Sequence, residues 1–150
     1  VRLVGTDFDI NYLVLPGLSV YANGGYTHSA INTYEVNPAV RGNRAPLVPE
    51  FNANLGVQYR HPITGSIGGF GRFGVEAHGA EYWDPENSTG RSPYDLLNLQ
   101  LGVETLSRSL SLVFFVNNLA DKAYNANYVS GGFTIPAEPR TFGATLRFDL

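Results

Sequence analysis

The sequence ends in Thr141-Phe142-Gly143-Ala144-Thr145-Leu146-Arg147-Phe148-Asp149-Leu150, and this stretch decides the fold. Every second side chain from Phe142 to Leu150 is apolar, and the intervening ones from Thr141 to Asp149 are polar or glycine. Such alternation predicts a β-strand with one apolar and one polar face. Its length matches the roughly 9–11 residues with which a tilted strand crosses the hydrocarbon layer of a bilayer. A soluble edge strand can alternate in the same way, so the rest of the chain must discriminate.

The composition favours many strands and a sparsely charged surface. Charged residues make up 15% of the chain, below the roughly 25–35% expected on a soluble domain's surface. No stretch approaches the roughly 18 apolar residues of a membrane helix, so any membrane contact would be made by a barrel. The net charge of −3 gives no indication of a nucleic-acid partner. Since the chain begins at Val1 and contains no methionine, we expect a processed or excised piece of a longer protein.

Six further stretches alternate with a period of two residues, less regularly in the glycine-rich stretch 67–83 and in 110–117, where Val113 and Phe115 interrupt the polar side. They are residues 4–14, 18–31, 51–60, 67–83, 97–104 and 110–117. In residues 97–104, a leucine or valine at every odd position opposes Asn98, Gln100 and Glu104. The sequence therefore predicts about seven strands, each with an apolar and a polar side.

The connections between these strands alternate in length. Short turns at 15–17, 61–66 and 107–109 are followed by long irregular segments at 32–49, 84–93 and 119–139. Transmembrane barrels have short turns at one membrane surface and long loops at the other. Phe51 and Tyr59 also lie near the two ends of an apolar face, as interfacial aromatic residues do. These patterns favour an all-β, antiparallel up-and-down transmembrane β-barrel over a soluble β-sandwich or lipocalin-like barrel.

An odd number of strands cannot close into an antiparallel barrel, because the first and last strands run in the same direction. Single-chain bacterial barrels have even counts of eight or more. Either an eighth strand lies within residues 126–135, or the chain is a section of a larger wall. Because unpaired strand edges are costly in lipid, we favour the section of a larger wall.

Two motifs resemble those of TonB-dependent outer-membrane receptors. The run Leu112-Val113-Phe114-Phe115-Val116-Asn117-Asn118-Leu119-Ala120-Asp121-Lys122-Ala123-Tyr124 is similar to a segment near the end of these receptors, and Glu138–Gly143 then opens the final strand as in that family. Residues 44–56 resemble the family's junction between a loop and a later strand. The spacing of Thr141, Gly143, Leu146 and Phe148 resembles the assembly signal of outer-membrane barrels, although here Asp149 and Leu150 follow Phe148.

The resemblance implies that residues 1–150 are the C-terminal part of a 22-stranded barrel, without its N-terminal plug domain. It implies import of a scarce nutrient such as a ferric siderophore, with TonB supplying the energy. The expected partners are therefore the plug domain and TonB of the complete receptor, the barrel-assembly machinery, outer-membrane lipid and lipopolysaccharide, and a small-molecule substrate. Two alternatives stay open, a small closed outer-membrane barrel that acts as a pore or adhesin, and a soluble β-barrel or sandwich that binds an apolar ligand.

The sequence contains no pattern that indicates catalysis, a cofactor or a metal. Residues 69–74 match G-x-G-x-x-G, but the alternation continues after them, whereas a dinucleotide site needs a helix there. Glu76 and His78 share a face without a second ligand cluster at metal spacing. We expect recognition to depend on the long segments, where arginine can pair with an anionic ligand and aromatic rings can stack on a ligand. The candidate substrate-contacting residues are Tyr34, Arg41, Arg44, Tyr82, Trp83, Tyr124 and Tyr128; alternatively, the arginines pair with lipopolysaccharide or nearby acids and the aromatic residues anchor at the interface.

Overall fold

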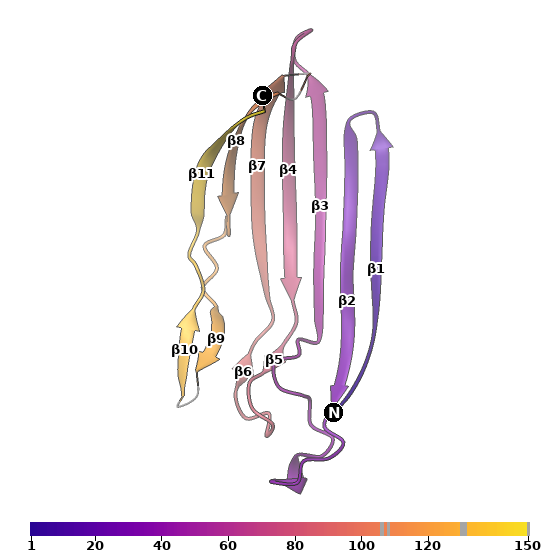
Figure 1. Cartoon of the computed structure of the whole chain (residues 1–150), viewed down its shortest axis with the longest axis vertical. Helices are drawn as coiled ribbons and strands as arrows, with labels where there is room; N and C mark the ends of the chain where they lie inside the picture. The colour runs from indigo at the N-terminus through magenta and orange to yellow at the C-terminus, as the bar shows by residue number, and fades with distance from the viewer. Residues whose placement is uncertain (106, 108, 130–131, 150) are drawn as a thin grey trace.

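A computed structural model shows one antiparallel sheet of seven long strands and two short hairpins (Figure 1). The structure describes residues 1–105, 107, 109–129 and 132–149. The sheet has the order β1-β2-β3-β4-β7-β8-β11. Its strands are β1 (Arg2–Leu15), β2 (Leu18–Ala30), β3 (Phe51–Pro62), β4 (Ile67–His78), β7 (Tyr94–Thr105), β8 (Leu110–Asn117) and β11 (Thr141–Phe148). The strands therefore follow one another across the sheet in chain order, which confirms the up-and-down arrangement and the expected seven strands.

The two hairpins lie outside the seven-stranded sheet. One pairs β5 (Glu81–Tyr82) with β6 (Gly90–Arg91), and the other pairs β9 (Asn125–Val129) with β10 (Phe133–Pro136). Of the two alternatives for the odd strand count, the structure favours a section of a larger wall, because the described residues of 126–135 lie in β9 and β10, which pair with each other and not with the seven-stranded sheet. The sheet is open, with β1 and β11 at its two edges.

The register between neighbouring strands places apolar side chains on one face of the sheet and polar side chains on the other. In an antiparallel pair, directly opposite residues lie on the same side of the sheet. Leu55 of β3 lies opposite Val75 of β4, which in turn lies opposite Leu97 of β7. On the other face, Asn23 of β2 lies opposite Asn54 of β3. The period-two pattern of the sequence thus becomes one continuous apolar face and one continuous polar face.

No layer of the described chain packs against the apolar face. Among the described residues, the buried hydrophobic side chains are those of Ile31, Val40, Ala45 and Tyr94; three lie in a long connection and one begins β7. In contrast, Phe142 is 79% exposed and Leu101 is 53% exposed. A soluble sandwich buries one face of each sheet against the other, so this open single layer does not favour the soluble alternative.

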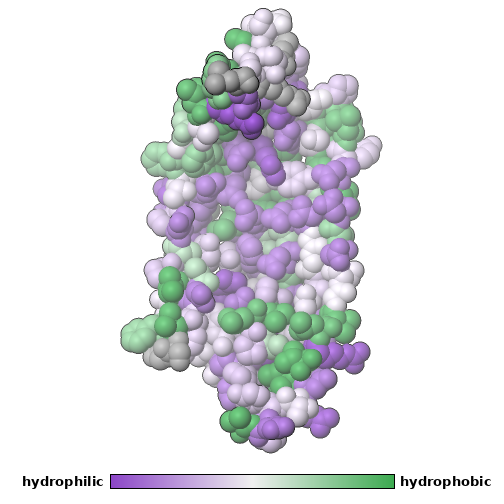
Figure 2. All heavy atoms as spheres, viewed as in Figure 1, coloured by the Kyte–Doolittle hydropathy of each residue, from purple (hydrophilic) through white to green (hydrophobic). Residues whose placement is uncertain are grey.

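The short turns at 16–17 and 63–66 lie at one end of the sheet and the long connections lie at the other (Figure 1). Hydrophilic side chains run across the middle of the face shown in Figure 2. None of the described residues forms a helix of the length and apolar character that crossing a bilayer requires.

Two strands end earlier than the sequence predicts. The expected strand 67–83 leaves the sheet after His78, because the following residues bond to the end of the first long connection: Glu50 N donates to Ala80 O (3.1 Å) and Leu47 N donates to Tyr82 O (2.8 Å). The terminal strand ends at Phe148. Leu150, expected on its apolar face, and Arg108, expected in the turn at 107–109, lie outside the described residues.

Candidate functional site

The three long connections form one structured layer at their end of the sheet. The first, residues 31–50, has its own small core of Ile31, Val40 and Ala45. Its backbone closes through Gly42 N, which donates to Ile31 O, and Ile31 N, which donates to Asn43 O, at 2.9 Å each. The buried Ser29 Oγ accepts from Ala45 N at 3.1 Å. This connection is therefore an ordered cap on β2 and β3.

Asn87 fastens the second connection, residues 79–93, to the first. It has a positive φ of 56°, a conformation that asparagine tolerates better than most residues. Its side chain accepts from Arg44 N at 2.8 Å and donates to Arg44 O at 3.0 Å. Asn43 Nδ2 adds a bond to Pro85 O at 3.0 Å. These contacts fix the relative position of the first two connections.

Asp84 organises the turn within the second connection. Its carboxylate accepts from Ser88 N at 2.9 Å and from Thr89 N at 2.6 Å, and also from both hydroxyl groups. Burial raises the pKa of the Asp84 carboxyl, but the four hydrogen bonds outweigh it and hold the pKa below its ordinary value. Residues 84–89 therefore form a turn that is closed by the hydrogen bonds of Asp84.

Stacked rings join the third connection, residues 118–140, to the second and to the sheet. Trp83 stacks on Tyr128 of β9 with centroids 5.2 Å apart. Tyr94 stacks on Tyr124 at 4.1 Å and on His78 at 4.7 Å. Such pairs add about 0.5–1.5 kcal/mol each beyond the area they bury. The rings thus couple the base of the third connection to β4 and β7.

Arg91 lies inside this aromatic group. It is 12% exposed, its guanidinium lies 4.9 Å from the Tyr94 ring centre, and it pairs with Glu81 at 3.4 Å. Its Nη1 lies 3.5 Å from the carbonyl oxygens of Asn125 and Ala126. The sequence did not single out Arg91, because only the pairing of β5 with β6 places Glu81 opposite it.

The structure gives the seven candidate residues different surroundings. Tyr34 and Arg41 are exposed and line a shallow hollow in the first connection. Arg44 pairs with Glu50 at 3.0 Å. Tyr82 lies in β5 and its carbonyl accepts from Leu47 N. Trp83, Tyr124 and Tyr128 are half-buried in the stacks described above. The structure therefore brings four of the seven, Tyr82, Trp83, Tyr124 and Tyr128, into one ordered region.

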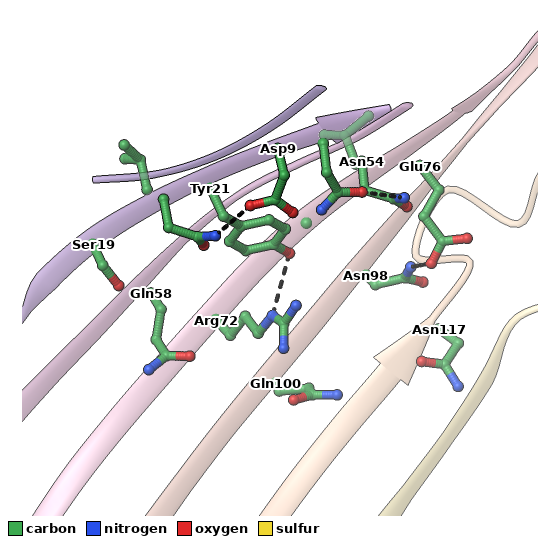
Figure 3. A pocket seen from close by; sticks show the side chains of 15 residues that line it. Asp9, Ser19, Tyr21, Asn54, Gln58, Arg72, Glu76, Asn98, Gln100 and Asn117 are labelled. Atoms are coloured by element: carbon green, nitrogen blue, oxygen red, sulfur yellow. Dashed lines mark hydrogen bonds between the residues drawn. The ribbon is translucent and has the colours of Figure 1, made fainter. Parts of the chain in front are cut away.

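The polar face of the sheet is hollowed between β1 and β8, with a cavity of about 620 Å³ (Figure 3). Its lining is rich in amide side chains, joined across strands by bonds from Asn54 to Asn23 at 3.0 Å and from Asn98 to Glu76 at 2.7 Å. His78 Nδ1 lies 2.8 Å from Asn52 Oδ1. The described residues contain no group of three or more His, Asp or Glu that could hold a metal ion. This face offers hydrogen bonds to water or to a polar partner.

Tyr21 is the aromatic residue of this hollow, and sequence reasoning missed its role. Its ring lies over Gly56 of β3 and reaches Gly74 of β4, where an added Cβ would meet the hydroxyl at 2.8 Å. Arg72 Nε donates to the Tyr21 hydroxyl at 3.2 Å, and its guanidinium lies 4.7 Å from the ring centre. Gly74 belongs to the G-x-G-x-x-G run, which therefore makes room for a neighbouring side chain within a strand.

The motif at 112–124 ends in a local network of hydrogen bonds around Asn118 and Asp121. Asn118 is 5% exposed with φ 50°, and its side chain bonds both Lys122 N (2.8 Å) and Lys122 O (3.0 Å). Asp121 accepts from Arg140 N at 2.9 Å, and Asn98 accepts from Asn118 N at 3.1 Å. This network therefore connects the end of β8 to β7 and to the residue that precedes β11.

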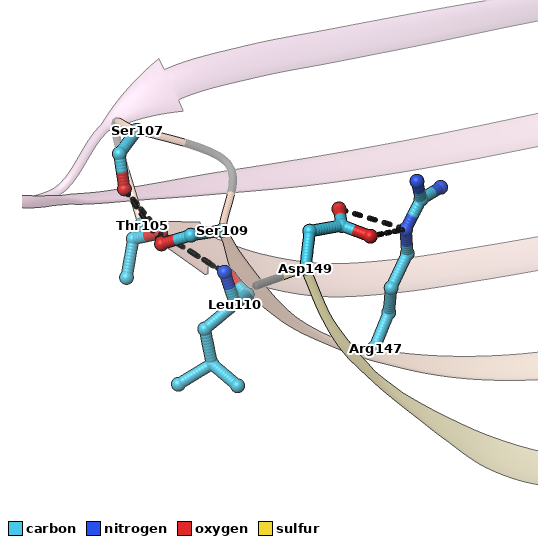
Figure 4. A network of polar contacts seen from close by, with 6 residues as sticks. All are labelled: Thr105, Ser107, Ser109, Leu110, Arg147 and Asp149. Atoms are coloured by element: carbon cyan, nitrogen blue, oxygen red, sulfur yellow. Dashed lines mark hydrogen bonds and ion pairs between the residues drawn. The ribbon is translucent and has the colours of Figure 1, made fainter.

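The terminal strand presents its signal residues on both faces. Thr141 and Gly143 lie opposite Asn117 and Phe115 on the polar face, and Leu146 and Phe148 lie opposite Leu112 and Leu110 on the apolar face. Past its end, Asp149 N donates to Ser109 O at 2.9 Å and the Asp149 carboxylate pairs with Arg147 at 3.0 Å (Figure 4). Pairing with β8 thus continues one residue beyond the strand.

A single antiparallel sheet with one polar face, one exposed apolar face and its short turns at one end is a section of an up-and-down β-barrel wall. The chain belongs to the TonB-dependent receptor β-barrel family, since residues 1–119 match the family model described as "TonB dependent receptor-like, beta-barrel".

A curated relative is similar to the chain in sequence, and two solved structures are similar to it in fold. The chain is 28% identical to the pesticin receptor of Yersinia pestis over 97% of its own length and 22% of that receptor's length. Its fold is similar to that of the ferric yersiniabactin uptake receptor FyuA from Yersinia pestis, with a TM-score of 0.81 at 24% identity over 99% of this chain and 23% of FyuA. The siderophore receptor PiuA from Acinetobacter baumannii gives 0.79 at 19% identity over 97% and 21%. The chain thus spans about a fifth of the length of these proteins.

Proposed function

We propose that the chain forms part of the wall and of the ligand-capturing end of an outer-membrane receptor that imports a ferric siderophore. The observation that carries the proposal is the sheet itself, which exposes an apolar face, hollows a polar face and gathers three ordered connections at one end. Membership of the receptor family supports it, and the similar structures include a ferric yersiniabactin uptake receptor and a siderophore receptor. Within this proposal, residues 1–150 are the C-terminal part of a 22-stranded barrel.

The apolar face is turned to lipid and the polar face to the barrel interior. Phe51 and Tyr59, near the two ends of the apolar face, are eight residues apart in β3, which is about 26 Å along a strand. An outer-membrane barrel has an apolar band about 25 Å tall with aromatic residues at both borders. The match supports a membrane-spanning orientation with the long connections outside the cell.

The proposed partners follow from the two faces and the two ends. The amide-rich hollow is suited to contact with a plug domain elsewhere in the complete receptor, where TonB would also act. The C-terminal strand, with Thr141, Gly143, Leu146 and Phe148, would be read by the barrel-assembly machinery. The outer ends of the strands would meet lipopolysaccharide.

Tyr34 and Arg41 are the candidate substrate contacts that are most accessible. Both are exposed and lie together in one hollow, so an anionic iron chelate could reach a ring and a guanidinium at the same place. Arg44 already has a carboxylate partner in Glu50, and it is therefore a weaker candidate.

Iron uptake by the complete receptor tests the proposal. In a Gram-negative strain without its own siderophore receptors, expression should give uptake of radioactive iron from a ferric siderophore, and deletion of TonB should abolish it. Arg41→Ala should lower the apparent affinity several-fold, whereas the exposed neighbour Val36→Ala should not. Solute flux that is independent of TonB, without iron uptake, would instead indicate a closed pore.

A further inference from the structure

A series of polar contacts leads from the end of β4 to the beginning of the third connection. His78 is the last residue of β4, and its Nε2 lies 3.8 Å from Glu76 Oε2. The other carboxylate oxygen of Glu76 accepts from Asn98 Nδ2 at 2.7 Å (Figure 3). Asn98 Oδ1 in turn accepts from Asn118 N at 3.1 Å. These four residues, here called the polar path, join a titratable ring to the hydrogen-bond network around Asn118.

The neighbours of His78 hold its ring in one orientation. Nδ1 lies 2.8 Å from Asn52 Oδ1 on β3, and the ring stacks on Tyr94 with centroids 4.7 Å apart. Because an amide oxygen only accepts, Nδ1 carries the proton of the neutral ring in this contact. Nε2 is then the nitrogen without a proton, and it is the one that lies beside Glu76. A second proton therefore enters the ring on the side of Glu76.

This proton changes the contact between His78 and Glu76 from unfavourable to favourable. Without it, the lone pair of Nε2 lies beside a carboxylate, and neither atom can donate. With it, a cationic donor lies beside an anionic acceptor, which is the setting of a charge-assisted hydrogen bond. Asn98 occupies Oε1 and His78 lies at Oε2, so the carboxylate can accept both bonds together. The proton thus fixes Glu76 and, through it, the Asn98 amide that holds Asn118.

The other ionisable groups near the ring do not replace Glu76 in this role. The titratable and charged side chains around His78 and its partner Tyr94 are Glu76, Glu81, Arg91, Tyr94 and Tyr124. Phenols ionise near about pH 10 and stay neutral at the pH of histidine titration. Arg91 opposes a second cation, but it pairs with Glu81 at 3.4 Å. Among the described residues, Glu76 is therefore the charged group in contact with the His78 ring.

We propose that His78 is a proton sensor for the third connection. Protonation at Nε2 joins His78 to Glu76 and tightens the polar path, and loss of the proton loosens the base of the third connection at Asn118. The stabilisation is present where His78 is protonated and is lost as the pH rises. Histidine is the side chain whose charge ordinarily changes between about pH 5 and 8, so moderate acidity is enough to tighten the path. The inference goes beyond iron import and does not depend on it.

Hydrogen exchange of the complete receptor in detergent tests the proposal. The reporters are the amides of Asn118 and Lys122, which donate to Asn98 Oδ1 and Asn118 Oδ1. After correction for the intrinsic rate at each pH, their protection should fall about two- to fivefold as the pH rises through the histidine range, the factor expected for one partly exposed ion pair. In His78→Gln this pH step should be absent, because the side chain at position 78 no longer takes up a proton.

Two further variants separate the ion pair from other effects. Glu76→Gln keeps an oxygen that accepts from Asn98 but removes the charge, so it should also lose the step. Its protection above the histidine range should stay near that of the unmodified receptor. His61→Gln, at the opposite end of the sheet on β3, is the matched control and should keep the step. The inference is overturned if the unmodified receptor shows no step, if His78→Gln or Glu76→Gln retains it, or if His61→Gln abolishes it.

Discussion

At the scale of single residues, glycines in the strands leave room for aromatic side chains of the neighbouring strand. The ring of Tyr21 occupies the volume that a Cβ at Gly56 would need, and Phe115 lies in the same way over Gly143 of the terminal strand. Aromatic rings laid over glycine in this way pin the register of a sheet. A glycine of the assembly signal therefore also has a packing role.

Gly56→Ala tests this role. The added methyl would collide with the Tyr21 ring, displace its hydroxyl from Arg72, and lower the free energy of unfolding by about 1–3 kcal/mol. Urea-induced unfolding of the complete receptor in lipid vesicles measures the change. Gly65→Ala is the matched control, because nothing lies within 4 Å of a Cβ there. Equal stability of the two variants would contradict the packing role of Gly56.

Asp84 predicts a pH dependence of the second connection. Because its folded pKa is below the ordinary value, its stabilisation is fully present above the ordinary pKa near 3.8 and is lost as the pH falls through the lowered folded value. Hydrogen exchange of residues 84–91, corrected for the intrinsic rate at each pH, should accelerate in that acidic range. In Asp84→Asn the exchange should be fast at every pH without this step. A step of the same size in the variant would show that another group titrates.

At the scale of elements, the geometry of the wall depends on how its strands are connected at their ends. The hydrogen-bond network at 118–122 connects three strands: the side chains of Asn98, Asn118 and Asp121 accept from the backbone N–H groups of Asn118, Lys122 and Arg140, respectively. Both residues have positive φ, at 50° and 52°, which lets the chain reverse tightly after β8. This accounts for the asparagine and aspartate of the motif without any contact to a ligand.

Asn118→Ala should therefore lower the stability of the receptor and also make the third connection more accessible to protease. It removes two hydrogen bonds to Lys122 and places alanine at a positive φ, so we expect a loss of about 1–3 kcal/mol. Limited proteolysis should cut residues 119–139 faster than in the unmodified receptor. Asn125→Ala, at an exposed side chain, is the control and should be cut at the original rate. If Asn118→Ala were cut no faster than the unmodified receptor, the Asn118 hydrogen bonds would not be what holds the third connection in place.

At the scale of the whole molecule, the orientation of the two faces is the assumption on which transport depends. Leu99→Arg, in the middle of β7 and opposite Phe73 and Val116, should lower stability by about 2–4 kcal/mol if this face meets acyl chains. Folding from urea into lipid vesicles measures the difference. A control on the polar face has to avoid Asn98, whose side chain bonds Glu76 and Asn118.

Gln100→Glu supplies that control, since it introduces a charge on the same strand directly opposite Arg72. It should fold with unchanged stability. If Leu99→Arg were also neutral, the apolar face would have to meet something other than hydrocarbon.

The amino-acid sequence was sufficient to predict the strands, their apolar and polar faces and the alternation of short turns with long connections. This was predictable because alternation along an extended chain is a local property, fixed by covalent geometry. The resemblance carried by residues 112–124 added the family, which the match over residues 1–119 confirms.

Contacts between residues that are distant in the sequence became known from the three-dimensional structure alone. Residues 126–135 left open an eighth wall strand, yet β9 and β10 pair with each other, and β8 pairs with β11. Likewise, neither Trp83 nor Tyr128 indicates its partner in the sequence, and nothing local predicts that Tyr21 covers Gly56. Such contacts depend on register between strands and on the path of long connections, which are set by the packing of the whole chain.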